Sequence, residues 1–212
     1  MTFVLGLTGS IGMGKSTTGA MFRNRGVPVH DADGAVHALY RGKAASLIEA
    51  AFPGTVQDGV VDRARLGAIV LGSTEQLRNL EGIVHPLVRA AEQAFLDRAV
   101  RSRAPIAILD IPLLIESGGM NRVDAVLVVT ARAEIQRDRV LARPGMDQAK
   151  FVAILARQVP DREKRARSHF LVDTGHGLHR AEAQVGDILR AIAGRDGRVA
   201  ATIRDTRPDR PA

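Results

Sequence analysis

Short apolar runs alternate along the chain with longer segments of helical periodicity. The runs are apolar almost throughout, as expected for parallel strands buried on both faces of a sheet. The predicted strands are residues 3–8, 27–30, 106–110, 124–130 and 170–173. The predicted helices are residues 15–24, 34–52, 63–71, 74–82, 85–102, 132–142, 147–158 and 179–193. Strands separated by helices predict an α/β, doubly wound fold with a five-stranded, mostly parallel sheet flanked by helices.

The spacing of these elements predicts the domain organisation. About 75 residues separate the second strand from the third, far more than the dozen or so that a simple crossover needs. We therefore expect a helical subdomain inserted at about 34–104 into one domain over 1–193. Residues 194–212 are rich in Gly, Arg, Asp and Pro and lack periodicity, which predicts a disordered tail.

The glycine-rich turn after the first strand carries the clearest chemical motif. Gly9-Ser-Ile-Gly-Met-Gly-Lys-Ser16 matches G-x-x-x-x-G-K-[ST], the phosphate-binding loop of a P-loop NTPase fold. Glycines let the backbone wrap a phosphate, Lys15 reaches the β and γ phosphates, and the Ser16 hydroxyl coordinates Mg²⁺. A glycine turn without function is the alternative, but the predicted strand before it and helix after it favour a nucleoside triphosphate site.

Acidic residues follow two of the predicted strands. Asp31 and Asp33 lie at the carboxyl end of the second strand, where ligands of open α/β sheets bind. Alternate residues of an extended segment point the same way, so both carboxylates could face one pocket, although either could instead cap the next helix. Asp110 ends the third strand like a Walker B carboxylate that holds Mg²⁺ through water; a solvated strand end or a helix cap is the alternative.

A basic segment follows the fourth strand, with ten basic and five acidic residues over 132–167. Arg139 and Arg143 are spaced i, i+4 on one predicted helix, which the Pro144–Gly145 pair then breaks. This pattern predicts a lid over about 139–160 whose arginines neutralise phosphate charge. The alternative is a solvated basic face, which is where we place Arg137, Arg162, Lys164, Arg165 and Arg167.

Composition narrows the class of partner. The formal net charge of +7, from 26 Arg and only 4 Lys against 23 acidic residues, indicates an anionic partner. Aromatic residues make up only 3%, which disfavours nucleic-acid modules that stack bases on rings. The absence of cysteine excludes disulfides and Cys-ligated zinc, and the histidines show no metal-site spacing.

Five stretches in this order resemble the dephospho-CoA kinase family over about residues 3–193. They are Gly6–Thr17 with the phosphate loop, His30-Asp-Ala-Asp33, Leu80–Pro86 with its His-Pro pair, Asp110-Ile-Pro-Leu-Leu-Ile-Glu116, and Gln136–Arg143 continuing to Gln158 and Lys164–Arg167. The resemblance implies transfer of the γ-phosphate of ATP to the ribose 3′-hydroxyl of dephospho-CoA, giving coenzyme A and ADP.

The resemblance also implies roles for individual residues. Asp33 is expected to be the general base, with Lys15 and Arg143 as the other catalytic residues. The expected ATP-binding residues are Gly9, Gly12, Met13, Gly14, Lys15, Ser16, Thr17, Arg139, Arg143 and Thr174. The expected acceptor-binding residues are Asp31, Asp33, His85, Asp110 and Leu114, and Mg²⁺ is expected at Ser16 and, through water, at Asp110.

Two departures from the family pattern affect the expected adenine contacts. Thr174 stands where the family commonly has Asn, and Ser168-His169 replaces a common Ala-Asp. The alternatives are a related nucleoside monophosphate kinase and, with less support, a nucleic-acid-binding ATPase; a GTPase lacks its Asn-Lys-x-Asp signature here. We expect a cytoplasmic protein, a monomer by default, that binds ATP and dephospho-CoA and neither nucleic acid nor membrane.

Overall fold

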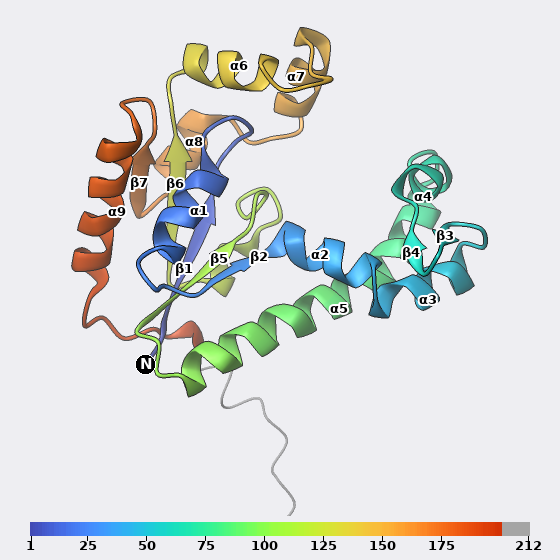
Figure 1. Cartoon of the computed structure of the whole chain (residues 1–212), viewed down its shortest axis with the longest axis horizontal. Helices are drawn as coiled ribbons and strands as arrows, with labels where there is room; N and C mark the ends of the chain where they lie inside the picture. The colour runs from blue at the N-terminus through green and yellow to red at the C-terminus, as the bar shows by residue number, and fades with distance from the viewer. Residues whose placement is uncertain (201–212) are drawn as a thin grey trace, which may run out of the picture. The chain divides into compact units, whose positions relative to one another are not determined.

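A five-stranded parallel sheet organises the larger part of the molecule, and its order is β2-β5-β1-β6-β7 (Figure 1). The computed structural model describes residues 1–200. The strands are β1 (Phe3–Thr8), β2 (Val29–Asp31), β5 (Ile106–Asp110), β6 (Ala125–Thr130) and β7 (Phe170–Asp173). Every residue of β1, β5 and β6 is buried, as their continuous apolar sequences predict. The α/β, parallel-sheet fold class is therefore confirmed.

Among the described residues, one compact unit comprises 1–30 and 96–200. Its helices are α1 (Lys15–Arg23), α6 (Ala133–Leu141), α7 (Gln148–Leu155), α8 (Asp161–Ala166) and α9 (Leu178–Ile192), with a short 3₁₀ helix η1 (Gly119–Arg122). The buried positions of α9 recur every three or four residues, from Ala181 through Val185 and Ile188 to Ile192, and they join the sheet core. Helices α6 and α7 follow β6 and lie beyond its carboxyl end (Figure 1).

A second unit covers residues 31–95, close to the predicted insertion at 34–104. Its elements are α2 (Ala32–Tyr40), α3 (Lys43–Ala51), β3 (Val56–Gln57), β4 (Val60–Val61), α4 (Arg63–Val70) and the first part of α5 (Thr74–Arg101). It has its own core, which includes Ile48, Phe52 and Leu66. The sequence predicted only a loop or turn over 54–59; the structure has a hairpin there, joined by a tight Asp58-Gly59 turn with both residues at positive φ.

Helix α5 corrects the prediction of two helices at 74–82 and 85–102. The structure has one helix of 28 residues that passes through Pro86. Proline removes the donor of one helical hydrogen bond, and its ring crowds the carbonyl one turn earlier. A long helix with packed apolar positions such as Leu80, Val84 and Leu96 can offset that cost. Among residues 1–200, no helix combines the length and apolar character needed to cross a bilayer.

The end of the described chain returns to its beginning, so the predicted disordered tail does not extend to residues 194–200. The Asp124 carboxylate accepts from the N–H groups of Arg198 and Val199 at 2.7 and 3.0 Å and from that of Val4 at 2.8 Å. Gly197 lies so close to β1 that a Cβ there would sit 2.0 Å from the Thr2 carbonyl oxygen. The rest of the predicted tail, 201–212, lies outside the described residues.

Candidate active site

The phosphate loop connects β1 to α1, as the motif predicts. Gly12 and Gly14 adopt positive φ angles of 78° and 92°, a backbone conformation that residues with a Cβ rarely adopt. Gly14 is the N-cap of α1, and Lys15 is the first residue of the helix. The N–H groups of the first helical turn lack intrahelical acceptors, so this end of α1 favours an anion.

Lys15 and Asp110 form an ion pair within this site. The Lys15 Nζ lies 2.7 Å from Asp110 Oδ1, and only 5% of the Asp110 side chain is exposed. Asp110 is the last residue of β5, which pairs directly with β1. Neighbouring parallel strands thus bring the predicted Walker B-like carboxylate to the ammonium group of the phosphate loop.

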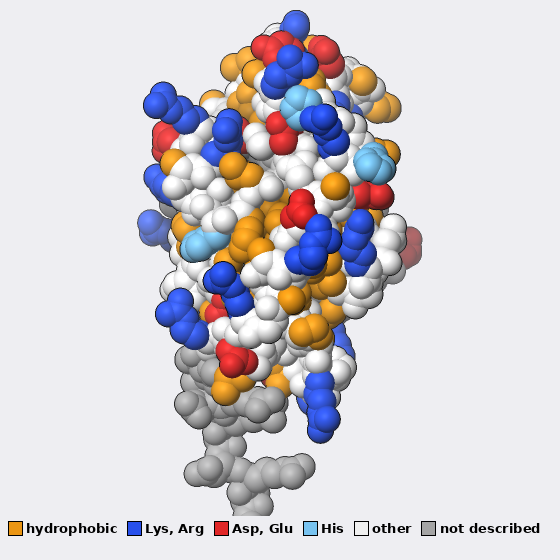
Figure 2. Space-filling view, turned by 90° about the vertical axis from the view of Figure 1, so that its left-hand side faces the viewer, with side chains coloured by type: hydrophobic (Ala, Val, Ile, Leu, Met, Phe, Trp, Pro, Cys, Tyr) orange, Lys and Arg blue, Asp and Glu red, His pale blue; other side chains and the backbone are white. Residues whose placement is uncertain are grey.

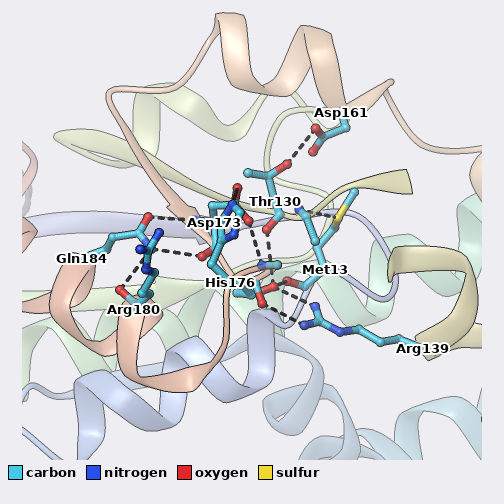
Figure 3. Close-up of polar contacts among 11 residues, drawn as sticks. Met13, Thr130, Arg139, Asp161, Asp173, His176, Arg180 and Gln184 are labelled. Carbon is cyan, nitrogen blue, oxygen red and sulfur yellow. Dashed lines mark hydrogen bonds and ion pairs between the residues drawn. The ribbon is translucent and has the colours of Figure 1, made fainter. Parts of the chain in front are cut away.

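Thr174 connects the phosphate loop to the arginine of α6. Its Oγ1 donates to the Met13 carbonyl at 2.8 Å. Arg139 donates to Thr174 Oγ1 at 2.7 Å and to the Thr174 carbonyl at 2.9 Å (Figure 3). The Ala131 N–H meets the Met13 sulfur at 3.1 Å on the other side of the loop. A short hydroxyl side chain therefore links three segments where the family commonly has Asn.

A pocket of about 380 Å³ opens beside this network. It contains both predicted lid arginines, although Arg143 lies just beyond the end of α6 at Leu141 and not on its face as predicted. The lining residues are Gly12, Gly14, Thr17, Met21, Arg139, Arg143, Thr174, Gly177, Leu178 and Ala181. Two guanidinium groups, a glycine loop and an apolar wall suit a ligand with phosphates at one end and a flat apolar body at the other.

The two aspartates after β2 do not lie on one extended segment, which corrects the prediction. Asp31 ends the strand and is the N-cap of α2, where its carboxylate accepts from the Gly34 N–H at 3.0 Å. Asp33 lies in the first turn of α2 with an exposed side chain. The helix begins at Ala32, two residues earlier than the alternation argument requires, so Asp31 takes the capping alternative and the Asp33 side chain is exposed in the first turn.

The structure also revises the surroundings of two predicted acceptor contacts. His85 is exposed within α5 and does not begin a helix. Leu114 is fully buried, and its side chain packs against Gly6 and Gly119. Packing leaves Leu114 no surface for a substrate, whereas its neighbour Leu113 is 45% exposed.

The basic segment contains a buried cation, although its charge pattern predicted a solvated face for this residue. Lys164 in α8 is fully buried, and its Nζ lies 2.7 Å from Glu116 Oε1. The same Glu116 oxygen accepts from the Val159 N–H at 3.0 Å, and Thr130 Oγ1 donates to Asp161 Oδ2 at 2.8 Å (Figure 3). The run of charged residues around Lys164 did not predict this burial. The one sequence feature that could have indicated it is Glu116, the acid of the Pro-Leu-Leu-x-Glu stretch.

His169 lies away from the expected adenine contacts. It precedes β7, at the amino end of that strand, whereas the phosphate loop lies at the carboxyl ends. The His169 Nδ1 accepts from the Val126 N–H at 3.1 Å, while the main-chain N–H of His169 donates to the Val126 carbonyl at 2.8 Å. The imidazole thus extends the pairing of β6 with β7, so this departure from the family pattern concerns the sheet.

The donor set at the loop fits a magnesium ion shared with a nucleotide. Ser16 and Asp110 offer hydroxyl and carboxylate oxygens, and Mg²⁺ is usually held by one or two carboxylates together with substrate phosphates and water. Within residues 1–200, no cluster of three or more His, Cys, Asp or Glu side chains could hold a metal by itself.

The distribution of charge gives no sign of a nucleic-acid surface on the face drawn in Figure 2. Lys and Arg side chains on that face are interspersed with acidic and apolar ones. A duplex or single strand is bound by a continuous basic stripe that follows its phosphates. The excess of arginine therefore does not by itself define a partner on this face.

Comparison with known proteins identifies the family. The family model described as dephospho-CoA kinase matches residues 3–179. The chain is 63% identical over 194 residues to a dephospho-CoA kinase of Mesorhizobium japonicum, covering 92% of this chain and 98% of the relative. It is 57% identical over 190 residues to one of Rhodopseudomonas palustris, covering 90% and 96%.

Solved structures share the fold. The crystal structure of TT1252 from Thermus thermophilus aligns with a TM-score of 0.79 at 33% identity, covering 91% of this chain and 98% of that one. A dephospho-CoA kinase from Campylobacter jejuni aligns with a TM-score of 0.69 at 24% identity and the same coverage. On the strength of the family model and these close relatives, the chain belongs to the dephospho-CoA kinase family.

Proposed function

We propose that this chain transfers the γ-phosphoryl group of ATP to the ribose 3′-hydroxyl of dephospho-CoA, giving coenzyme A and ADP. Membership of the family makes it an ATP-dependent kinase. The observation that carries the proposal is the ion pair between Lys15 and Asp110 at the phosphate loop, beside the pocket with Arg139 and Arg143.

The proposed chemistry depends on position and charge. The loop N–H groups and Lys15 bind the β and γ phosphates, and Arg143 and Arg139 offset the charge that spreads over the transferred group. Ser16, and Asp110 through water, would hold Mg²⁺, which supplies charge neutralisation when bound. Asp33 accepts the proton of the attacking hydroxyl, and its exposed carboxylate in the first turn of α2 leaves it free to do so.

Lys15 has two partners in this proposal. Its ammonium group contacts Asp110 in the structure described here and turns to the phosphates when ATP is present. Asp110, no longer paired with Lys15, would then be available to hold Mg²⁺ through water. Asp31 supports the site as the cap that starts α2. The exposed imidazole of His85 is the proposed contact for the acceptor.

The test is ADP release from Mg²⁺-ATP with dephospho-CoA, with AMP or CMP, and without acceptor. Release that requires dephospho-CoA and yields coenzyme A supports the proposal. Turnover with a nucleoside monophosphate alone would keep the ATP site and reject the acceptor. Equal release in every reaction would indicate an ATPase, which added DNA or RNA would then probe.

We also propose that the protein acts in the cytoplasm as a monomer without nucleic-acid or membrane partners. Both proposed substrates are water-soluble anions, and the described residues lack a membrane-spanning helix. Sedimentation of the purified protein with and without Mg²⁺-ATP tests the monomer, and binding to DNA at low salt tests the absence of that partner.

A further inference from the structure

Both main-chain polar groups of Ile11, in the phosphate loop, are bound by side chains from distant segments. The Ile11 N–H donates to Gln158 Oε1 at 3.1 Å, and the Ile11 carbonyl accepts from Gln136 Nε2 at 2.7 Å. Gln136 lies in α6, before the Pro144–Gly145 turn, and Gln158 follows α7. The segment from α6 to the end of α7 therefore holds one residue of the loop from both of its ends.

The contact with α6 is also a close packing contact. A Cβ at Gly12 would lie 2.6 Å from Val140 Cγ2 and 2.9 Å from the Gln136 carbonyl oxygen, so the loop backbone lies directly against the helix. The Gln136 side chain reaches the loop from an almost completely buried position, with 6% of the residue exposed. A buried amide in a fixed position loses little further side-chain entropy when it holds the loop.

The end of this segment that carries Gln158 is held in place by a buried ion pair. The residue after Gln158 is Val159, whose N–H donates to Glu116, and Glu116 pairs with the fully buried Lys164. These bonds tie the chain on either side of Pro160 to the segment that follows β5. Gln158 thus approaches Ile11 from an anchored backbone.

We propose that Gln136 and Gln158 are positioning residues that hold Ile11, so that the N–H groups of Gly12 to Ser16 stay aligned to bind the triphosphate. A peptide group that is hydrogen-bonded only to water can rotate at little cost. The two peptide groups that flank Ile11 cannot, because the N–H of one and the carbonyl of the other are each held by a side chain. A loop that needs no reorganisation binds its anion more tightly and stabilises the transition state better. The inference rests on the proposed function only in taking the triphosphate of ATP as the ligand of the loop.

Glutamate at each position gives a matched pair of variants. Gln158→Glu keeps an oxygen that accepts from the Ile11 N–H, whereas Gln136→Glu replaces the donor with an oxygen that faces the Ile11 carbonyl. Both variants add the same negative charge beside the same residue, so charge repulsion of ATP is a shared effect. We expect kcat/KM for ATP to be at least 10-fold lower in Gln136→Glu than in Gln158→Glu.

Methionine variants remove either bond without adding charge. Gln136→Met and Gln158→Met should each weaken binding of a fluorescent ATP analogue, and the double variant should lose less than the sum of the two because both act on Ile11. KM for dephospho-CoA should stay within about 2-fold of wild type, since these bonds lie on the ATP side. If Gln136→Glu does not fold, binding of the ATP analogue to the two methionine variants tests the proposal instead.

Equal effects of the two glutamate variants would overturn the proposal. So would a lowered Tm with unchanged affinity for the ATP analogue, because that result describes a purely structural contact. ATP-analogue binding does not require the acceptor, so a wild-type protein that binds ATP but leaves dephospho-CoA unmodified would reject the proposed function and leave this inference open to the same titration.

Discussion

Only Ala32 separates Asp31 from Asp33, yet their carboxylates have different surroundings because α2 begins between them. The Asp31 carboxylate is occupied by the Gly34 N–H, and the Asp33 side chain is exposed one position into the helix. An N-cap fixes the backbone entry to a helix and satisfies one of its first N–H groups. The two residues therefore differ in what a substitution should change.

Asp33→Asn should lower kcat by roughly 10²–10⁴-fold, the range expected when a general base is lost. The amide keeps the size of the side chain and its place on α2 but cannot accept the hydroxyl proton. Steady-state kinetics with saturating ATP and dephospho-CoA measure the change. A kcat within a few-fold of wild type would remove Asp33 from the proposed mechanism.

Asp31→Asn is the matched control, because asparagine caps helices about as well as aspartate. This variant should keep both kcat and thermal stability near wild type. Asp31→Ala should lower the free energy of unfolding by about 0.5–2 kcal/mol through loss of the cap, with a much smaller effect on kcat than Asp33→Asn. A large loss of kcat in Asp31→Asn would instead indicate a direct substrate contact.

Leu114→Ala tests the packing role that the structure gives this residue. Its fully buried side chain fills the space over Gly6, so truncation should cost about 2–5 kcal/mol of unfolding free energy. KM for dephospho-CoA, measured well below the melting temperature, should change little. Leu113→Ala is the exposed neighbour and should hardly change stability. A raised KM with unchanged stability would restore the predicted substrate contact.

The sequence predicted the residues whose role depends on a local motif. The phosphate loop, Lys15 and the following helix were all evident from eight consecutive residues. The use of Thr174 as a link between Met13 and Arg139 was not, because it depends on three segments meeting in space. Burial of Lys164 depends likewise on an acid 48 positions earlier in the chain.

At the scale of elements, Glu49 fixes the connection between α3 and the β3–β4 hairpin. Its carboxylate accepts from the Gly54 and Val56 N–H groups at 2.7 and 2.8 Å. The Gly54 bond has the largest effect on the pKa of Glu49, which lies below its usual value despite some desolvation. Both bonds are therefore made by the charged form.

This shift gives the stability of residues 31–95 a pH dependence of known sign. A carboxyl whose pKa is lower in the folded state stabilises the fold above its unfolded pKa and loses that contribution as pH falls through the folded value. Glu49→Gln should therefore be less stable than wild type at neutral pH and approach wild type under acidic conditions. Thermal melts of both proteins from pH 7 to pH 3 measure the difference. A difference in melting temperature that does not change with pH would reject the contribution of the charged Glu49 carboxylate.

The periodicity of the sequence predicted the long helices and strands. The predictions were wrong where short elements or contacts between distant segments determine the backbone conformation. The strands and most helices were predicted within a few residues because continuous apolar runs and helical spacing persist over many positions. The helix predicted over 34–52 was wrong, since the structure has two helices there, α2 and α3, and the short helix α8 was not predicted. The β3–β4 hairpin has two residues in each strand, too few for a period to show. Proline at 86 suggested a break that the packing of α5 overrides.

At the scale of the whole molecule, the segment 194–200 contributes to the sheet unit through Asp124. A chain that ends at residue 193 should melt at a lower temperature than one that ends at 200. Two hydrogen bonds to a carboxylate are lost, and each such bond contributes about 1.5–3 kcal/mol. Differential scanning calorimetry compares the two chains; equal melting temperatures would show that the contacts contribute nothing.

Gly197→Ala probes the same contact without shortening the chain. A Cβ at this position meets the main chain of β1 and cannot be relieved by a side-chain rotation. We expect the variant to lose a large part of what the truncated chain loses. Gly194→Ala would not be a fair comparison, because Gly194 has a positive φ of 76° and a Cβ there would be strained for a different reason.

The position of β1 in the sheet has a consequence for synthesis on the ribosome. The first strand to be made is the central one, and its neighbours β5 and β6 begin only at residues 106 and 125. At roughly 5–20 residues per second, β1 waits roughly 5–20 s for its first partner. During that interval a six-residue strand with no charged side chain has both edges unpaired, which makes it a template for pairing with other chains until β5 and β6 are made.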